Sequence, residues 1–287
     1  MKPPIRQIKK IGKTVVQIHV EAQPSNWEWD LLLRSDAHHD NSLCDQALEK
    51  KHLDEAKERG AGILDIGDNF CAMQGKGDPR SDRSQMRGEL AHNNYFDRLV
   101  DTASGFYQPY AENWLMMSPG NHETSVLDRH GTNLTERLAE RMKAAGSPVQ
   151  VGSYQGWVQL VFHWHVKDSK VFNIRYTHGY GGGGPVTKDT IQAARQLAYL
   201  ENADFLISGH CHDSWYMVQP RERIDRLGNA SVRDVAMLKI GGYKDEYSGG
   251  NGWAAGKGHP PKPAGGWWIR FYIRHEEVRY RVLRCER

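Results

Sequence analysis

The stretch that decides the fold reads LISGHCHD and spans residues 206–213. Its apolar run ends at Ser208 and Gly209, and two histidines, His210 and His212, follow with one residue between them. An apolar run that stops at a small, turn-forming pair is typical of a buried strand and its carboxyl end. The stretch therefore predicts a strand that delivers two imidazoles to one edge of a sheet.

Four other apolar runs end in the same way, with aspartate, asparagine or histidine at their carboxyl ends. The residues that follow them are Asp36 and His38, Asp68, Asn121 with His122 and Glu123, and His178. Ligands of open α/β sheets bind at the carboxyl ends of the strands, so we expect these side chains to meet. So many polar groups at one edge need compensation, which two divalent cations would supply. Imidazole, carboxylate and amide oxygen suit manganese, zinc or iron.

The order of the remaining segments predicts an α/β fold. Apolar runs alternate with amphipathic stretches in the first half of the chain, and the second half is rich in strands. We expect one domain over residues 1–287, with a long Gly-rich loop at 241–266. Strands are expected at residues 30–33, 62–66, 114–117, 157–166, 170–177, 204–207, 215–219, 232–240, 267–274 and 278–283. Helices are expected at residues 42–59, 89–106, 132–145 and 186–202.

Composition excludes several classes of protein. With 39% hydrophobic residues the chain can bury a sizeable core, and its net charge of +3 does not by itself demand a nucleic-acid or membrane partner. Four cysteines among 287 residues are too few for a disulfide scaffold. The basic N-terminus lacks the apolar run of a secretory signal, and no stretch has the length of a membrane span. We therefore expect a cytoplasmic protein with free thiols and no membrane partner.

In this order the motifs resemble those of the calcineurin-like metallophosphoesterase family. That family reads D-x-H, G-D, G-N-H-[DE], H and G-H-x-H, and the matching segments span residues 30–213. The resemblance implies two mixed β-sheets packed as a sandwich flanked by helices. It also implies two divalent metal ions, manganese being favoured and zinc, iron or magnesium remaining open. One would be held by Asp36, His38, Asp68 and His212, and the other by Asp68, Asn121, His178 and His210, with Asp68 as the bridge.

The chemistry expected of such a centre is hydrolysis of a phosphate ester. Two cations acidify the water that bridges them, so that a hydroxide attacks phosphorus, and they neutralise the phosphoryl oxygens. His122 fills no ligand position of the motif and is the expected general acid or transition-state stabiliser. Glu123 is expected to orient the loop or cap the next helix. Cys71 stands where many family members carry Asp or His, so the group that orients His122 is left open.

Two segments are candidates for substrate contact. The first, residues 74–87, carries Lys76, Arg80 and Arg83 shortly after Asp68, and the second is the 241–266 loop with Trp253. Each is either a phosphate- or base-binding element or a solvated surface loop. We favour a phosphodiesterase or nuclease that acts on DNA or RNA. The alternatives are a phosphomonoesterase acting on a nucleotide or phosphoprotein, and a non-catalytic metal-binding protein; the oligomeric state is left open.

Overall fold

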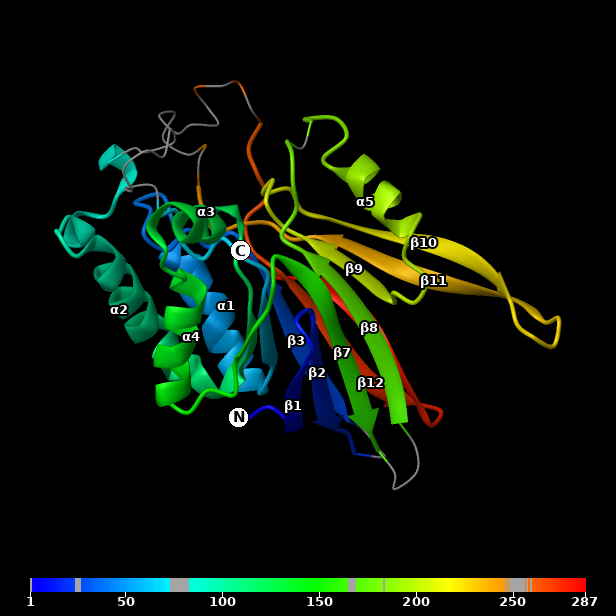
Figure 1. Cartoon of the computed structure of the whole chain (residues 1–287). Helices are drawn as coiled ribbons and strands as arrows, with labels where there is room; N and C mark the ends of the chain where they lie inside the picture. Colours follow the sequence, from blue (N-terminus) through cyan, green and yellow to red (C-terminus); the bar gives the residue numbers. More distant parts are fainter. Residues whose placement is uncertain are drawn as a thin grey trace.

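The computed structural model of the protein describes residues 2–23, 27–72, 83–164, 169–182, 184–245 and 260–287, together with residues 247, 256 and 258. Within these residues the strands form two mixed β-sheets, one of seven strands and one of six (Figure 1). The prediction of an α/β fold with two mixed sheets is therefore confirmed.

The seven-stranded sheet joins strands from both halves of the chain. Its strands in spatial order are β1 (Ile5–Ile11), β2 (Val15–Glu21), β7 (Gln155–His163), β8 (Ser169–Thr177), β9 (Phe205–Ser208), β11 (Ala230–Lys239) and β10 (Trp215–Ile224). β8, β9 and β11 are parallel to one another. Their carboxyl ends therefore lie at a common edge.

The six-stranded sheet has the same property. Its strands in spatial order are β13 (Glu277–Arg284), β12 (Trp267–Arg274), β3 (Glu28–Arg34), β4 (Gly62–Asp65), β5 (Trp114–Met117) and β6 (Gln150–Val151). From β3 to β6 the pairing is parallel, whereas β12 runs antiparallel to β3. The carboxyl ends of β3, β4 and β5 are thus neighbours.

The main hydrophobic core lies between the two sheets. It contains Leu31 of β3 and Phe271 of β12 from one sheet, and Leu160 of β7 and Ile207 of β9 from the other. All four side chains are fully buried. Side chains of a strand alternate between its two faces, so these residues mark the inner faces of a sandwich.

Helices cover the outer faces of this sandwich (Figure 1). A second apolar cluster packs four helices against the six-stranded sheet, and a third packs the last helix against β9 and β11. The helices of the first group are α1 (Gln46–Arg59), α2 (Tyr95–Tyr107), α3 (Asn121–His130) and α4 (Leu134–Ala144), and the last helix is α5 (Thr190–Leu197). The described helices include none with the length and apolarity that crossing a membrane requires.

All four predicted helices begin later than the sequence predicts, and the reason is identifiable for α1 and α5. α1 starts at Gln46 instead of residue 42, because the Asp45 side chain accepts the Leu48 N–H and caps the helix there. α5 starts at Thr190 instead of residue 186, because Lys188 and Asp189 have φ of 45° and 68°, values that no right-handed helix contains.

Candidate metal centre

The carboxyl ends of β3, β4, β5, β8 and β9 meet on one side of the molecule, as the sequence predicts. Backbone hydrogen bonds join the segments that follow these strands. Within the sheets, the Asp36 N–H donates to the Gly67 carbonyl at 2.9 Å and the Gly209 N–H donates to the His178 carbonyl at 3.0 Å. Between the sheets, the His210 N–H donates to Asp36 Oδ2 at 2.9 Å. Both sheets therefore contribute side chains to one polar cluster.

Five residues of the cluster hold the backbone in the left-handed region. They are Asp36, His38, Asp68, His210 and His212, with φ between 48° and 77°. Residues other than glycine rarely adopt this conformation, because the Cβ atom crowds the backbone. Such strain concentrates at functional sites, where the surrounding contacts hold it in place. Its recurrence here indicates that these turns aim side chains at a ligand.

Glycines allow the turns to approach one another. A Cβ atom on Gly120 would lie 2.1 Å from Asp68 Oδ1, and one on Gly209 would lie 2.1 Å from Ser35 Oγ. Gly179, with φ of 116°, brings the backbone after β8 against His210. The turn after β8 therefore passes close to the cluster at Gly179.

Asp36, His38 and His212 form the first of the candidate metal-binding groups among the described residues. His212 Nε2 lies 3.3 Å from Asp36 Oδ1 and 3.2 Å from His38 Nε2. Asp36 Oδ1 is buried and has no hydrogen-bond partner among the described residues apart from this contact with His212 Nε2, so a cation would complete its surroundings. Burial, followed by the charges of His122 and His212, lowers the pKa of His38. His38 is therefore a neutral imidazole, which has one unprotonated ring nitrogen that can bind a cation.

Asp68, His178 and His210 form another such group, and Asn121 adjoins it. His178 Nε2 lies 3.1 Å from both Asp68 Oδ2 and Asn121 Oδ1, and His210 Nδ1 lies 2.8 Å from the same Asn121 oxygen. His178 Nδ1 donates to the Ile66 carbonyl at 3.0 Å, which leaves Nε2 facing two acceptors. Such a contact requires a second proton or a cation. Although burial opposes it, the Asp68 charge raises the pKa of His178 to about 9.

Asp68 links the two groups. A third candidate group consists of His38, Asp68 and His122, so that Asp68 shares one group with His38 and another with His178. Although burial opposes it, the charges of His178 and His122 hold the pKa of Asp68 well below its usual range. Asp68 is therefore an ionised carboxylate placed between the two sets of imidazoles.

The backbone carbonyl of Cys71 orients His122. His122 Nδ1 lies 2.5 Å from this carbonyl oxygen, which can only accept, so Nδ1 carries the proton. His122 Nε2 then points to the cluster, 3.8 Å from Asp68 Oδ2. The Cys71 side chain is buried, with its Sγ 3.2 Å from His38 Nδ1. The sequence left this orienting group open because a backbone contact has no residue signature.

Glu123 fixes the loops around Asp68 and caps α3. Its Oε2 accepts the N–H groups of Gly120 at 2.7 Å and Asp68 at 3.1 Å, and its Oε1 accepts the Phe70 N–H at 2.9 Å. Burial, followed by the Asp68 charge, raises the pKa of Glu123 to about 8, while the backbone donors of Phe70 and Gly120 act against this rise. The predicted capping and orienting role is confirmed.

A buried arginine, Arg34, supports the turn that carries Asp68 through an ion pair with Asp65, and the sequence did not predict this contact. Arg34 Nε contacts Asp65 Oδ2 at 2.8 Å, and Arg34 Nη2 contacts Glu49 Oε1 at 2.9 Å. Asp65 Oδ1 accepts the Gly67 N–H at 2.9 Å and the Asn69 side chain at 2.7 Å. Asp68 therefore stands on a turn whose two flanking residues are both bonded to one carboxylate. The available signal was an arginine at the end of the apolar run DLLLR.

Of the predicted substrate residues, Lys76, Arg80 and Trp253 lie outside the described residues. Arg83 begins a short 3-10 helix, Arg83–Gln85, and its side chain lies outside the described part of the chain. All four assignments stay predictions.

Lys244 lies beside the cluster and belongs to the 241–266 loop, which the sequence indicates as a candidate for substrate contact. Its neighbour Tyr243 donates its N–H to the Asp36 carbonyl at 3.0 Å, and Lys244 itself forms a backbone bridge with Cys44. Burial is the main cause of the lowered pKa of His38, and the Lys244 charge is a smaller one. A positive charge thus stands close to the predicted metal ligands.

Comparison with known proteins adds only distant structural likenesses. No family model matches the chain, and no curated protein matches it. A structure of Vacuolar Protein Sorting 29 from Cryptosporidium parvum is 13% identical, with a TM-score of 0.34, and the match covers 91% of this chain and 100% of that one. For GAP50, the anchor in the inner membrane complex of Plasmodium, the identity is 12%, the TM-score 0.38 and the coverage 85% and 81%.

A third match is a double mutant of Vps29 from Entamoeba histolytica, with 13% identity, a TM-score of 0.25 and coverage of 68% and 90%. All of these TM-scores lie below 0.5, so the function is inferred from this chain's own residues.

Divalent cations fit the donor set of the cluster. Carboxylate, imidazole and amide oxygen are ligands of manganese, zinc and iron, and none of the predicted ligands is a thiolate. Two buried atoms also favour a cation: Asp36 Oδ1, whose partner is His212 Nε2, and His178 Nε2, which faces two acceptors. The structure therefore supports metal binding here, while the number and identity of the ions stay predictions.

Replacing Gly67 with alanine should lower the free energy of unfolding by about 1–3 kcal/mol. Gly67 has φ of 114°, and a Cβ atom there would lie 2.5 Å from the Gly120 nitrogen. Denaturant unfolding measures the loss. Gly88→Ala is the control, because nothing lies within 4 Å of a Cβ atom at that position. Equal stability of Gly67→Ala and the unchanged protein would show that the approach of the two turns is not tight.

Proposed function

We propose that the protein is a phosphoesterase that depends on two divalent cations. The observation that carries the proposal is the position of His122 at the edge of the histidine and aspartate cluster. Its Nδ1 proton is committed to the Cys71 carbonyl, and its Nε2 faces the cluster. A cluster that served structure alone would not require an oriented imidazole next to it.

The side chains of the cluster would have two roles in hydrolysis, cation binding and proton donation. Asp36, His38 and His212 would hold one cation, and Asn121, His178 and His210 the other, with Asp68 between them. Cations bound there would acidify a water molecule and neutralise phosphoryl oxygens. His122, when doubly protonated, can donate the Nε2 proton to the leaving oxygen while Nδ1 keeps its hydrogen bond to the carbonyl.

The finer proposal is that the substrate is a phosphodiester in DNA or RNA. Residues 74–87 are rich in arginine and follow Asp68 closely in the sequence. Lys244 adds a cation beside His38, and a positive charge there would attract the phosphate group of a substrate. A phosphodiester of DNA or RNA carries an alcohol on both sides of phosphorus, so the substrate is long. Several separate basic groups around the site would bind such a substrate best.

A comparison of matched esters tests both levels of the proposal. Aryl phosphate monoesters and diesters, and a short oligonucleotide, are assayed with Mn²⁺, Zn²⁺ or Mg²⁺ added to chelator-treated protein. We expect no turnover without a cation, recovery with Mn²⁺, and a larger kcat/KM for the diester. A strong monoester preference would favour the phosphomonoesterase, and bound metal without turnover of any ester would favour the non-catalytic protein.

A further inference from the structure

The seven-stranded sheet opens into a cleft at the end opposite the metal centre. β9 pairs with β8 only from Ile174 onward, and with β11 only from Ala236 onward. Both neighbours begin earlier than β9, so they extend past its amino end, where Asp204 lies. Figure 1 shows the β10–β11 hairpin projecting far beyond the body of the sheet. The cleft lies between this hairpin and β8.

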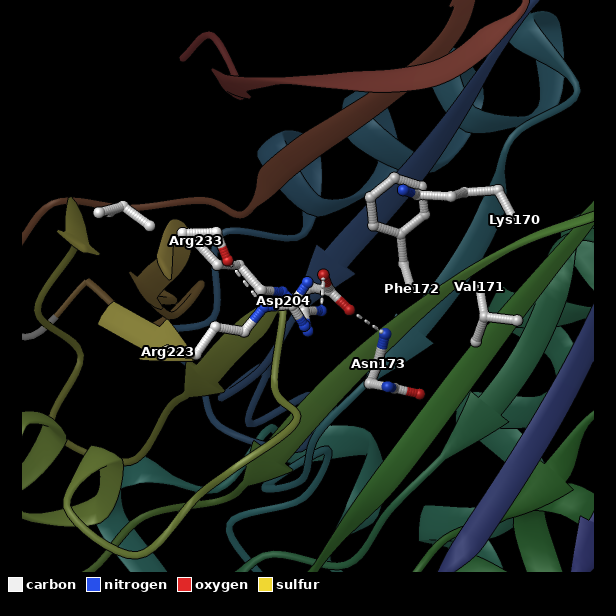
Figure 2. A pocket seen from close by; sticks show the side chains of 9 residues that line it. Lys170, Val171, Phe172, Asn173, Asp204, Arg223 and Arg233 are labelled. Atoms are coloured by element: carbon white, nitrogen blue, oxygen red, sulfur yellow. Dashed lines mark hydrogen bonds and ion pairs between the residues drawn. The ribbon is translucent and has the colours of Figure 1, made fainter. Parts of the chain in front are cut away.

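The cleft is a cavity of about 570 Å³, a size that accommodates a nucleotide. Three cations, Lys170, Arg223 and Arg233, line it together with one carboxylate, Asp204 (Figure 2). Arg221 lies directly opposite Arg233 in the β-ladder and adds a cation on the same strand pair, which also carries the carboxylates Glu222, Asp225 and Asp234. Like charges directly opposite each other destabilise an antiparallel pair, so an anion bound beside them would be stabilising.

The carboxylate in the cleft, Asp204, already has partners within the protein. Asp204 Oδ1 pairs with Arg233, and Asp204 Oδ2 accepts the Asn173 N–H at 2.8 Å (Figure 2). Arg223 donates its Nε proton to Ser231 Oγ at 3.2 Å, which orients the guanidinium without neutralising it. Lys170 Nζ lies 5.7 Å from the Phe172 ring centroid. Among the described residues, Lys170 and Arg223 form no ion pair, and they leave the cleft with two positive charges to be matched.

We propose that this cleft binds a phosphate group of a polynucleotide. Guanidinium groups bind phosphate oxygens through paired N–H donors, and an ammonium group adds a mobile point charge. Arg223 and Lys170 belong to different ribbons, one on each side of the cleft, so a phosphate between them would be held from both sides. This site is separate from the metal centre, because the two lie at opposite ends of β9.

The test measures binding of a short fluorescent phosphorothioate single strand to the full-length protein, by anisotropy at several salt concentrations. Each phosphate contact that is lost should reduce the slope of log Kd against log salt by about 0.7 for a single strand. Lys170→Gln/Arg223→Gln should therefore reduce the slope by about 1.4. The control, Arg141→Gln/Lys143→Gln, removes the same two residue types from α4 on the other sheet and should leave the slope unchanged.

Two outcomes would overturn the site. One is a slope that does not change in Lys170→Gln/Arg223→Gln, and the other is a poly-glutamate peptide that competes with the strand as well as unlabelled DNA does. Repeating the titration with chelator and with Mn²⁺ separates the cleft from the metal centre, since the cleft's contribution should be the same in both. A slope effect in a protein that hydrolyses no ester would support the cleft and contradict the proposed function.

Discussion

Replacing Asp68 with asparagine should remove at least one of the two cations and abolish detectable hydrolysis. Asp68 is the buried carboxylate that shares candidate metal-binding groups with both His38 and His178. An amide at this position has one oxygen ligand and no negative charge, so it cannot bridge two cations. Metal content after dialysis and turnover of an aryl diester, measured on the same preparation, give the result.

Asp30→Asn is the matched control for this prediction. Asp30 is also buried and ion-paired, with Arg59 and Arg270, but it lies near the amino end of β3, away from the metal centre. It should cost stability without changing metal content. Two cations per chain and normal turnover in Asp68→Asn would exclude the bridging role and with it the proposed arrangement of the site.

The strand ends could be predicted from the sequence because burial leaves a strong local signal. β5 has the predicted bounds, residues 114–117. The observed bounds of β3, β4 and β9 differ from the predicted ones by a few residues at most. Short strands that are buried on both faces are continuous apolar runs, and the polar residue that follows marks the carboxyl end. Parallel pairing then makes the ends of β3, β4 and β5 neighbours in one sheet and the ends of β8 and β9 neighbours in the other.

The amino-terminal hairpin shows where this signal fails. β1 reads IRQIKKI, in which the apolar residues are three apart and all the remaining residues are polar. This spacing does not favour a strand. β2 does alternate, with Val16, Ile18 and Val20 buried. Its other face carries polar residues, and the strand follows a basic segment, so the alternation was not recognised in the sequence. Its place beside β7 depends on a pairing of residues far apart in the sequence, which no local pattern records.

The contacts that orient the side chains of the site could not be predicted from the sequence either, for a related reason. The Cys71 carbonyl orients His122, and any residue at position 71 could supply it. Arg34 and Asp65 meet below the Asp68 turn because β3 and β4 are parallel neighbours. Residue types therefore identified the atoms that can bind metal, whereas the support around them is set by backbone geometry.

Replacing His122 with asparagine should slow hydrolysis by about 10²–10⁴-fold while both cations stay bound. Asparagine can still reach the Cys71 carbonyl but carries no proton that it can give to a leaving alkoxide. The loss should be largest for esters with poor leaving groups, because those need the proton most. The slope of log kcat against leaving-group pKa, compared with that of the unchanged protein, measures this dependence.

The competing role for His122 is metal binding, since its ligand atom lies in a group with those of His38 and Asp68. The two roles predict different results for the same variant. A ligand would take a cation with it when replaced, and added Mn²⁺ would restore part of the activity for all leaving groups alike. A proton donor leaves metal content unchanged and steepens the leaving-group dependence. His130→Asn, at the exposed end of the same helix, should change neither quantity.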